Sequence, residues 1–419
     1  MKKKYAFAGA SARAYSMFAE NIVNHFSEYA EMVGIYDINY KRAEVFSSDF
    51  GNFPVFRDFD EMLQETKPDT VIVTTVDAFH SDYIIRSLKA GCDVITEKPM
   101  TTDKEKCEAI LEAEKESGKK VTVTFNYRYA PYMTEIKKFI AEGNLGEIYS
   151  VDFEWTLDRV TDILGHGASY FRRWNRYMKN SGGLLVHKST HHFDLVNWWI
   201  DQDPEQVFAY GKLNLYGKNG KFRGKNCREC EHKNECEFYE DITKDWYIKK
   251  YYTDCEDVDG YNKDACIFAE DIDIYDTMSV NVKYRQGAIL NYTLNATAAY
   301  EGWRMSINGS KGRLEADHPE SGIRALDDTL KLTFYDLSGN IITREIPKLR
   351  TGHGGGDVRL LKSVFVGKQE DPLGHQAGTL AGANSILIGA SANISIKENR
   401  PVMIDEGVPM LKELLEKKK

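Results

Sequence analysis

The stretch YAFAGASARA, residues 5–14, decides the fold of the first third of this 419-residue chain. Its apolar residues 5–8 predict a buried β-strand, and Gly9 ends that strand in a tight turn. Apolar residues at helical spacing over 14–26 predict a helix directly after the turn. A strand that runs through a glycine turn into a helix is typical of the unit in which a helix connects two parallel strands.

The same alternation of strand and helix continues to about residue 125. We expect further strands at 33–36, 70–74, 94–96 and 121–125, and helices at 40–48, 80–90 and 104–117. This alternation predicts a parallel sheet covered by helices on both faces. In such sheets a ligand binds at the carboxyl ends of the strands, so the residues that follow each strand are the candidates for function.

The turn after the first strand carries part of a dinucleotide-binding pattern. Gly9 is followed by the small residues Ser11 and Ala14 where a full pattern has two more glycines, with Ala12 and Arg13 between them. Small residues let the backbone approach a pyrophosphate at a helix N-terminus, so we expect residues 9–13 to bind a cofactor. The alternative is that Gly9 only makes a tight turn.

Asp37 stands at the end of the second predicted strand, 28 positions after Gly9. An acid there can accept the ribose hydroxyls of NAD and would repel the additional phosphate of NADP. Arg42 lies close enough in sequence to weaken that repulsion. We therefore expect NAD, with NADP less favoured, while the alternative is that Asp37 only caps the next helix.

Length and composition limit the classes of protein. Apolar residues make up 42% of the chain and charged residues 28%, which is typical of a globular protein, and the length favours two domains. The net charge of −9 argues against a nucleic-acid partner, because phosphate binding needs a basic face. No apolar run of about 18 residues occurs, so we expect no membrane span. The short apolar run near the N-terminus favours a strand over a signal peptide, and we expect a cytoplasmic protein.

Four motifs in order resemble the Gfo/Idh/MocA family of NAD(P)-dependent sugar oxidoreductases. The first follows the third predicted strand and the second follows the fourth. The third is a later glycine pair with a histidine-containing stretch, and the fourth is a late turn. The motifs are Thr75-Val76-Asp77-Ala78-Phe79-His80; Glu97-Lys98-Pro99-Met100; Gly182-Gly183 with His191-His192-Phe193-Asp194; and Asn308-Gly309-Ser310-Lys311-Gly312. Val76 and Asp77 depart from the proline and asparagine usual in the family.

The resemblance implies a fold and an assembly. It implies an α/β N-terminal Rossmann domain over residues 1–124 and a substrate-binding α+β domain over 125–419. The second domain has a large, mostly antiparallel open sheet with helices on one face, and its other face often makes homodimers or homotetramers. Runs typical of strands fit that sheet. They occur at 148–156, 277–284, 288–295 and 304–308.

The resemblance also implies a catalytic set. Oxidising a secondary alcohol requires a base for the hydroxyl proton and a group that stabilises the alkoxide. Lys98 would stabilise the reacting oxygen, and Thr75, His80 and Glu97 belong to the cofactor side. The alternative for Lys98 is a solvated side chain paired with Glu97.

His191 is the expected general acid/base, because histidine exchanges protons near neutral pH. Residues 183–200 predict one helix, on which His187, His191 and Asp194 share a face. His187 stands where the family usually has aspartate, so proton transfer could be shared between the two histidines. Partly buried structural histidines are the alternative, and a zinc-protease pattern is absent because no glutamate lies between them.

Two further stretches predict substrate contacts. Residues 165–176 mix aromatic and basic side chains, which suits sugars because rings stack on C–H faces and cations bind hydroxyls. Tyr170, Arg172 and Trp174 are the candidates there, and Arg128 follows the fifth strand. Asp194 completes the expected substrate set. An oligomer contact is the alternative for the aromatic and basic stretch.

Five of the seven cysteines lie in a charged, tyrosine-rich insertion, residues 224–272. The spacing of Cys227, Cys230 and Cys236, with Cys266 as a fourth ligand, would suit a structural zinc ion or an iron–sulfur cluster. Free thiols or redox-dependent disulfides are the alternative. We expect the insertion to shape the substrate entrance or subunit contacts.

The sequence thus predicts an oxidoreductase that moves a hydride between NAD(H) and a hydroxyl or keto carbon of a sugar, glycoside or cyclitol. Two other functions stay open. One is an NAD-dependent glycosidase that acts by transient oxidation and elimination, and the other is a non-catalytic NAD-binding regulatory protein.

Overall fold

Six parallel strands form the sheet of the N-terminal domain in the order β3-β2-β1-β4-β5-β6. The computed structural model describes residues 2–159, 166–321, 324–325, 327–367 and 370–417, so Gly165, which opens the predicted aromatic and basic stretch, lies outside the described residues. The order reverses between β1 and β4, and this is the point where an open α/β sheet binds its ligand. The strands are β1 Lys3–Ala8, β2 Ala30–Tyr36, β3 Val55–Phe56, β4 Thr70–Val73, β5 Asp93–Thr96 and β6 Val121–Val123.

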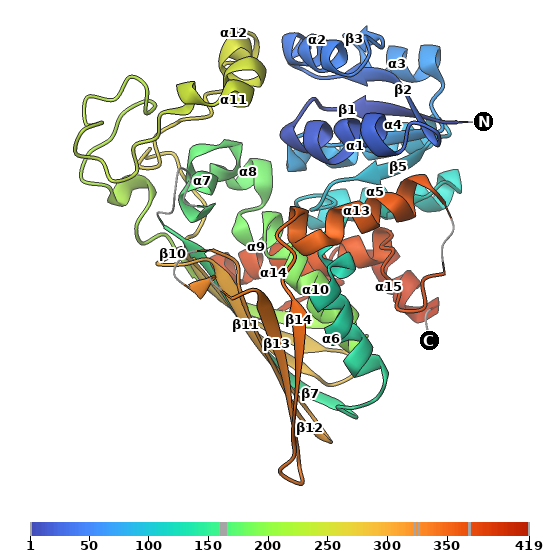
Figure 1. Cartoon of the computed structure of the whole chain (residues 1–419), viewed down its shortest axis with the longest axis vertical. Coiled ribbons are helices and arrows are strands. Elements are labelled where there is room, and N and C mark those ends of the chain that lie inside the picture. The colour runs from blue at the N-terminus through green and yellow to red at the C-terminus, as the bar shows by residue number, and fades with distance from the viewer. Residues whose placement is uncertain (1, 160–165, 322–323, 326, 368–369, 418–419) are drawn as a thin grey trace.

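Helices cover both faces of this sheet, as Figure 1 shows. The first begins as a π-helix, Ala14–Ala19, and continues as α1, Glu20–His25. The others are α2 Tyr40–Asp49, α3 Phe59–Thr66, α4 His80–Lys89 and α5 Lys104–Ser117. The predicted Rossmann domain is confirmed. The sequence did not predict β3 and α3, because a strand of two residues and a helix of eight carry little periodic signal.

The C-terminal domain is a nine-stranded sheet in the order β14-β13-β12-β11-β7-β10-β9-β8-β15. Among the described residues of this sheet only β10 and β7 pair in parallel, so the sheet is mixed and mostly antiparallel, as predicted. The strands are β7 Ile148–Asp158, β8 Pro204–Lys212, β9 Thr277–Tyr284, β10 Ile289–Ala298, β11 Gly302–Gly309, β12 Gly312–Pro319, β13 Thr329–Asp336, β14 Ile341–Pro347 and β15 Val402–Met403.

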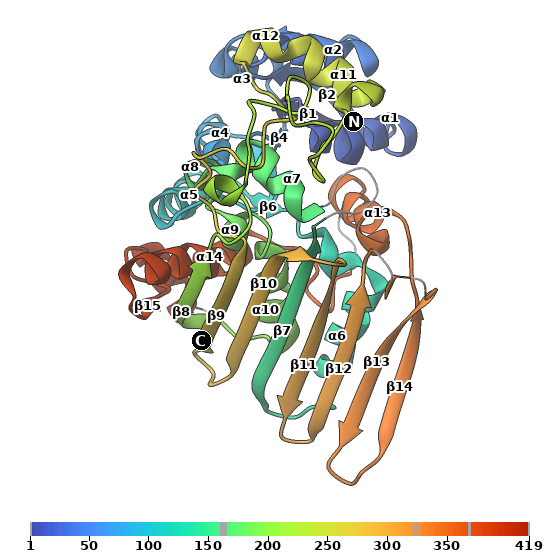
Figure 2. The ribbon, with the colours of Figure 1, turned by 90° about the vertical axis from the view of Figure 1, so that its left-hand side faces the viewer.

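Helices pack on one face of this sheet and leave the other face bare (Figures 1 and 2). Side chains along β9 alternate between buried and exposed, as a sheet covered on one side requires. The helices are α6 Pro131–Ala141, α7 His166–Arg172, α8 Met178–Ser181, α9 Leu184–His187, α10 Thr190–Ile200, α13 Gly352–Phe365, α14 Thr379–Glu398 and α15 Pro409–Lys417.

Helix α14 is long and apolar enough to cross a membrane by length and composition alone. In the fold, 72% of its apolar window is buried, and it packs against α10 and β8. Its apolar character is therefore that of a core helix between the two domains.

The prediction of a single helix over residues 183–200 is wrong. The chain forms two helices, α9 and α10, because two hydrogen bonds depart from the four-residue spacing of an α-helix. The amide of Ser189 donates to Leu184 O, five residues back, and the amide of His191 donates to Lys188 O, three residues back. The carbonyl of His187 is thereby released from the helical pattern. His187 and His191 consequently do not follow one another along one continuous helix face.

The insertion carries two short helices, α11 Trp246–Tyr251 and α12 Glu256–Asp259. In both ribbon views they lie beside α2 at the edge of the N-terminal domain, although some 200 residues separate them in sequence (Figures 1 and 2).

Candidate active site

One cavity of about 530 Å³ opens at the carboxyl end of the parallel sheet and is lined by both domains and by the insertion. Most of the residues predicted for the site line it. They are Ser11, Ala12, Arg13, Asp37, Thr75, His80, Glu97, Lys98, Tyr170, Trp174, His187 and His191.

Gly9 shapes the cavity without lining it. Its φ of +101° is in the left-handed region, and a Cβ there would stand 3.0 Å from the backbone of Thr74 and Thr75. Only glycine permits this close approach of the first turn to the end of β4. Gly9 therefore sets the path of the turn that exposes Ser11 and Ala12.

Asp37 holds the first turn and the second strand together. Its carboxylate accepts hydrogen bonds from Ala10 N at 2.6 Å and Asn39 N at 2.7 Å. Arg42 lies 3.8 Å from it and is also held by Asp259 at 3.0 Å. Arg42 is thus engaged within the protein.

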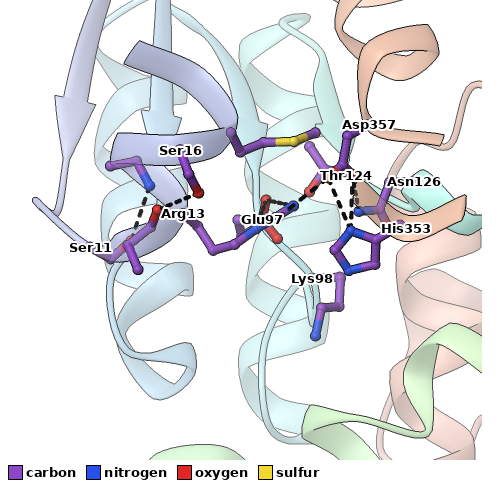
Figure 3. A network of polar contacts seen from close by, with 12 residues as sticks. Ser11, Arg13, Ser16, Glu97, Lys98, Thr124, Asn126, His353 and Asp357 are labelled. Atoms are coloured by element: carbon purple, nitrogen blue, oxygen red, sulfur yellow. Dashed lines mark hydrogen bonds and ion pairs between the residues drawn. The ribbon is translucent and has the colours of Figure 1, made fainter. Parts of the chain in front are cut away.

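A polar network joins Arg13 to the C-terminal domain, as Figure 3 shows. Arg13 pairs with Glu97 at 3.0 Å and lies 3.9 Å from Asp357. Asp357 in turn accepts from Asn126 at 2.6 Å and lies 3.1 Å from the ring of His353. Glu97 is therefore a partner of Arg13, so the alternative in which it pairs with Lys98 is not what the structure forms.

His80 connects the loops that follow β4 and β5. Its ring nitrogens lie 2.9 Å from Pro99 O and 3.1 Å from Thr75 O. With both nitrogens occupied, His80 holds the segment that carries Lys98 in place.

Lys98 reaches across the domain boundary. Its Nζ donates to the carbonyl of His187 at 3.3 Å, which is the carbonyl that the helix break releases. Burial and the nearby charge of Lys188 lower the pKa of Lys98 from 10.5 to about 7. A lysine with this pKa can exchange a proton near neutral pH.

His187 forms a close pair with Asp77. The distance from Nδ1 to Asp77 Oδ2 is 2.5 Å, and both side chains are largely buried. Burial raises the pKa of Asp77 and lowers the pKa of His187, so the site favours the neutral form of each group. The other ring nitrogen is left for a ligand in the cavity.

His191 is buried, and neither of its ring nitrogens has a hydrogen-bond partner among the described residues. Its ring stacks on Tyr127 with the centroids 4.4 Å apart, and burial lowers its pKa well below 6.5. Buried polar groups are normally satisfied. A neutral imidazole that lines a cavity without a partner is therefore ready to bind a polar ligand.

Lys188 brings a lasting positive charge to the cavity. Burial lowers its pKa, but the nearby Tyr170 hydroxyl and the carboxyl groups of Glu301 and Glu320 outweigh burial and raise it. The chain of contacts continues from the Tyr170 hydroxyl to His166 Nε2 at 2.6 Å and from His166 Nδ1 to Glu301 at 2.7 Å. This network borders the cavity on the side of the C-terminal domain.

Three residues predicted to bind substrate do not line the cavity. Arg128 and Asp194 form a buried two-pronged ion pair with distances of 2.7 and 2.5 Å. Arg172 is buried against the insertion, where it donates to Cys227 Sγ at 3.0 Å and pairs with Glu240 at 3.2 Å. These partners satisfy the three charges inside the fold, so the residues position other elements.

Several residues that line the cavity escaped prediction. They are Asp77, His166, Arg173, Lys188, Tyr252, Asp259, Tyr261, Lys263 and His353. Asp77 carried a signal, because it departs from the family motif, as does His187 with which it pairs. The residues from the insertion carried none, since only the fold shows that this segment returns to the N-terminal domain.

The four cysteines predicted to bind metal line a second, small cavity of about 20 Å³ in the insertion. Sulfurs there accept hydrogen bonds, as from Phe268 N to Cys266 Sγ at 3.4 Å. Within the part of the chain that the structure describes, no three His, Cys, Asp or Glu side chains are arranged to hold a metal ion. All seven cysteines are free thiols.

Two family models match nearly the whole chain. The NAD-binding Rossmann domain of the Gfo/Idh/MocA oxidoreductase family matches residues 3–125, and its C-terminal alpha/beta domain matches residues 137–404. The chain is 43% identical to YteT of Bacillus subtilis (strain 168), an oxidoreductase by its name, over 96% of this chain and 98% of YteT.

Other relatives are named as dehydrogenases of sugars and inositols. The scyllo-inositol 2-dehydrogenase (NAD(+)) of the same organism is 29% identical over 44% of this chain and 50% of its own. Among solved structures, the WlbA dehydrogenase from Bordetella pertussis, in complex with NADH and UDP-GlcNAcA, has a TM-score of 0.66 at 18% identity and covers 96% of this chain and 99% of its own. The structural likeness supports the fold.

Proposed function

Because the chain belongs to the Gfo/Idh/MocA family of oxidoreductases, we propose that it is an NAD-dependent dehydrogenase that interconverts a secondary hydroxyl and a keto group on a sugar, glycoside or cyclitol. One observation carries the proposal. Lys98 from the nucleotide-binding domain and His187 from the second domain meet on one wall of the cavity. The Nζ of Lys98 lies 3.3 Å from the carbonyl oxygen of His187. The relatives named as inositol and sugar dehydrogenases point to the same substrate class.

Residues of the first turn would hold the cofactor. The small side chains of Ser11 and Ala12 leave the backbone amides open to a pyrophosphate, and Asp37 faces the same cavity for a ribose. When bound, NAD would accept a hydride from the carbon that carries the hydroxyl. Arg42 is held by Asp37, by Asp259 and by Tyr251 O at 2.8 Å, so it is not available for the additional phosphate of NADP.

Lys98 is the proposed base. With a pKa of about 7, a useful fraction of its amine is neutral at physiological pH and can take the hydroxyl proton. Once protonated, the ammonium favours the negative charge that develops on the same oxygen. The positive charge of Lys188 keeps the pKa of Lys98 low, so that both the neutral amine and the ammonium form are populated near neutral pH.

The histidines are proposed to hold neighbouring hydroxyls. His191 offers an unpartnered neutral imidazole, and His187 offers the ring nitrogen that Asp77 does not contact. A substrate with several adjacent hydroxyls would satisfy both rings. Tyr170 and Trp174 supply aromatic walls of the kind on which sugar rings stack.

We also propose a cytoplasmic location and a homodimer or homotetramer. Seven free thiols suit a reducing compartment. The bare face of the nine-stranded sheet carries apolar side chains such as Tyr210 and Ile289, which are 63% and 50% exposed, and would suit a contact between copies.

A screen of monosaccharides, glycosides and inositols with NAD and with NADP tests the proposal by following absorbance of the reduced nicotinamide. We expect turnover with NAD on at least one polyhydroxylated ring and at least a hundredfold loss in Lys98→Met, since a positioned acid/base contributes about 10²–10⁴-fold. Lys89→Met, an exposed lysine on α4, is the matched control. Equal activity of Lys98→Met and the control would refute the assignment.

A further inference from the structure

The insertion reaches the cofactor half of the cavity. Tyr252, Asp259, Tyr261 and Lys263 line the same space as Ser11, Ala12 and Asp37. Figure 2 shows α11 and α12 beside α2, far from the strands that flank the insertion in sequence. A segment that served only the substrate entrance would have no need to reach this far.

Polar contacts fasten the insertion to the N-terminal domain. Arg42 on α2 donates to Tyr251 O at 2.8 Å and pairs with Asp259 at 3.0 Å. Asn39 donates to Cys255 O at 2.8 Å, and the Tyr251 hydroxyl donates to Asp49 at 2.7 Å. Both Arg42 and Asn39 are buried, so these contacts are shielded from water.

Aromatic packing adds to this attachment. The ring of Tyr15, on the helix that follows the first turn, lies 5.2 Å from the rings of Tyr247 and Tyr251. The insertion thus packs on the helix that directly follows Ser11, Ala12 and Arg13, which line the cavity.

The contact at the first turn is the most informative. Tyr252 lines the cavity together with Ala12 of the first turn, and the Ala12 amide is among the groups that lower the pKa of the Tyr252 hydroxyl. The ammonium of Lys263 lies 3.7 Å from the centroid of the Tyr252 ring. Burial alone would raise the pKa of the Tyr252 hydroxyl, yet Lys263, Arg42 and the Ala12 amide lower it. This corner of the cavity therefore favours negative charge on an oxygen.

We propose that the insertion is a clasp for the dinucleotide, in which Lys263 and Tyr252 contact the diphosphate and the Arg42–Asp259 pair keeps the clasp closed. The proposal rests on the proposed NAD-dependent function. The Arg42–Asp259 pair at 3.0 Å and the buried hydrogen bond from Asn39 to Cys255 O would hold the insertion against the N-terminal domain while the cofactor is bound, and would so slow its release.

Binding and exchange of NAD on the substrate-free protein test the clasp. The variants are Lys263→Met, which removes the charge and keeps the side-chain length, and Asp259→Asn, which weakens the pair with Arg42. Lys244→Met, an exposed lysine of the same insertion, is the matched control. Affinity is measured by titration of protein fluorescence, and exchange by the rate at which bound NADH is chased by excess NAD. Circular dichroism and thermal melting of each variant confirm folding.

We expect Lys263→Met to weaken NAD binding about tenfold or more, and Asp259→Asn to speed the release of NADH at least as much, while Lys244→Met behaves as wild type. If both site variants match the control in affinity and exchange, the clasp is refuted while NAD binding and the dehydrogenase proposal stand. If the wild-type protein binds neither NAD nor NADH, both proposals fail.

Discussion

The Nζ of Lys98 donates to the carbonyl of His187 at 3.3 Å, and this bond joins the two domains at the wall of the cavity. It exists because α9 ends at His187 and releases that carbonyl from the helix. Lys98 is thereby aimed at the space between the domains, where its neighbours determine its proton affinity.

The first prediction concerns pH. Oxidation requires the neutral amine of Lys98, so kcat/KM for oxidation should rise as pH increases through about 7 and then level off. Lys188→Met removes a positive charge that lowers the pKa of Lys98, so the midpoint should move to higher pH. Lys188→Arg keeps the charge and should leave the midpoint in place. A midpoint that stays unchanged in Lys188→Met would show that another group controls the profile.

The second prediction concerns the pair of Asp77 and His187. Asp77→Asn keeps the size of the side chain but removes the carboxyl group that lies 2.5 Å from the imidazole of His187. We expect kcat/KM to fall by about 10²-fold, within the range that acid/base groups contribute, with the cofactor affinity little changed. Asp82→Asn, on the exposed side of α4, serves as control. Wild-type kinetics in Asp77→Asn would mean that His187 needs no carboxylate partner.

The third prediction concerns stability. Arg128 and Asp194 are both more than nine-tenths buried, so removing one leaves the other charge without its partner. Arg128→Met should lower the free energy of unfolding by about 3–5 kcal/mol, as breaking a buried ion pair does. Denaturant unfolding measures this, and the double variant Arg128→Met with Asp194→Leu should recover part of the loss. If Arg128→Met unfolds like wild type but raises KM for the sugar, Arg128 binds substrate instead.

The fourth prediction concerns the cysteine cavity. Four thiols line it but are not arranged as metal ligands in the described residues, so holding a metal would require the two parts of the insertion to close on the ion. On that hypothesis, protein purified under reducing conditions contains about one equivalent of zinc or a bound iron–sulfur cluster. Replacing Cys227 and Cys230 together by serine should abolish the bound metal. Cys255→Ser, at a cysteine of the insertion that does not line this cavity, should retain it. Elemental analysis with an absorption spectrum distinguishes zinc from iron, and metal-free protein of unchanged stability would contradict the hypothesis.

Local patterns predicted much of the fold correctly. The helix over Lys104–Ser117 and the strand over Thr277–Tyr284 were predicted to the residue, because periodicity and end signals are properties of neighbouring residues. The same reasoning failed at residues 183–200, where a hydrogen-bond pattern that spans five residues breaks the helix. Nothing in the apolar spacing marks that break.

By itself the sequence determined the parallel sheet, the tight turn at Gly9 and the position of Lys98 after β5, since each depends on residues adjacent in the chain. Tertiary structure alone decided that Arg128 and Asp194 neutralise each other, that Asp77 pairs with His187, and that Lys263 lines the same cavity as Asp37. These outcomes depend on which charges the fold brings together inside a poorly solvated interior, and that pairing is a property of three-dimensional packing rather than of spacing along the chain.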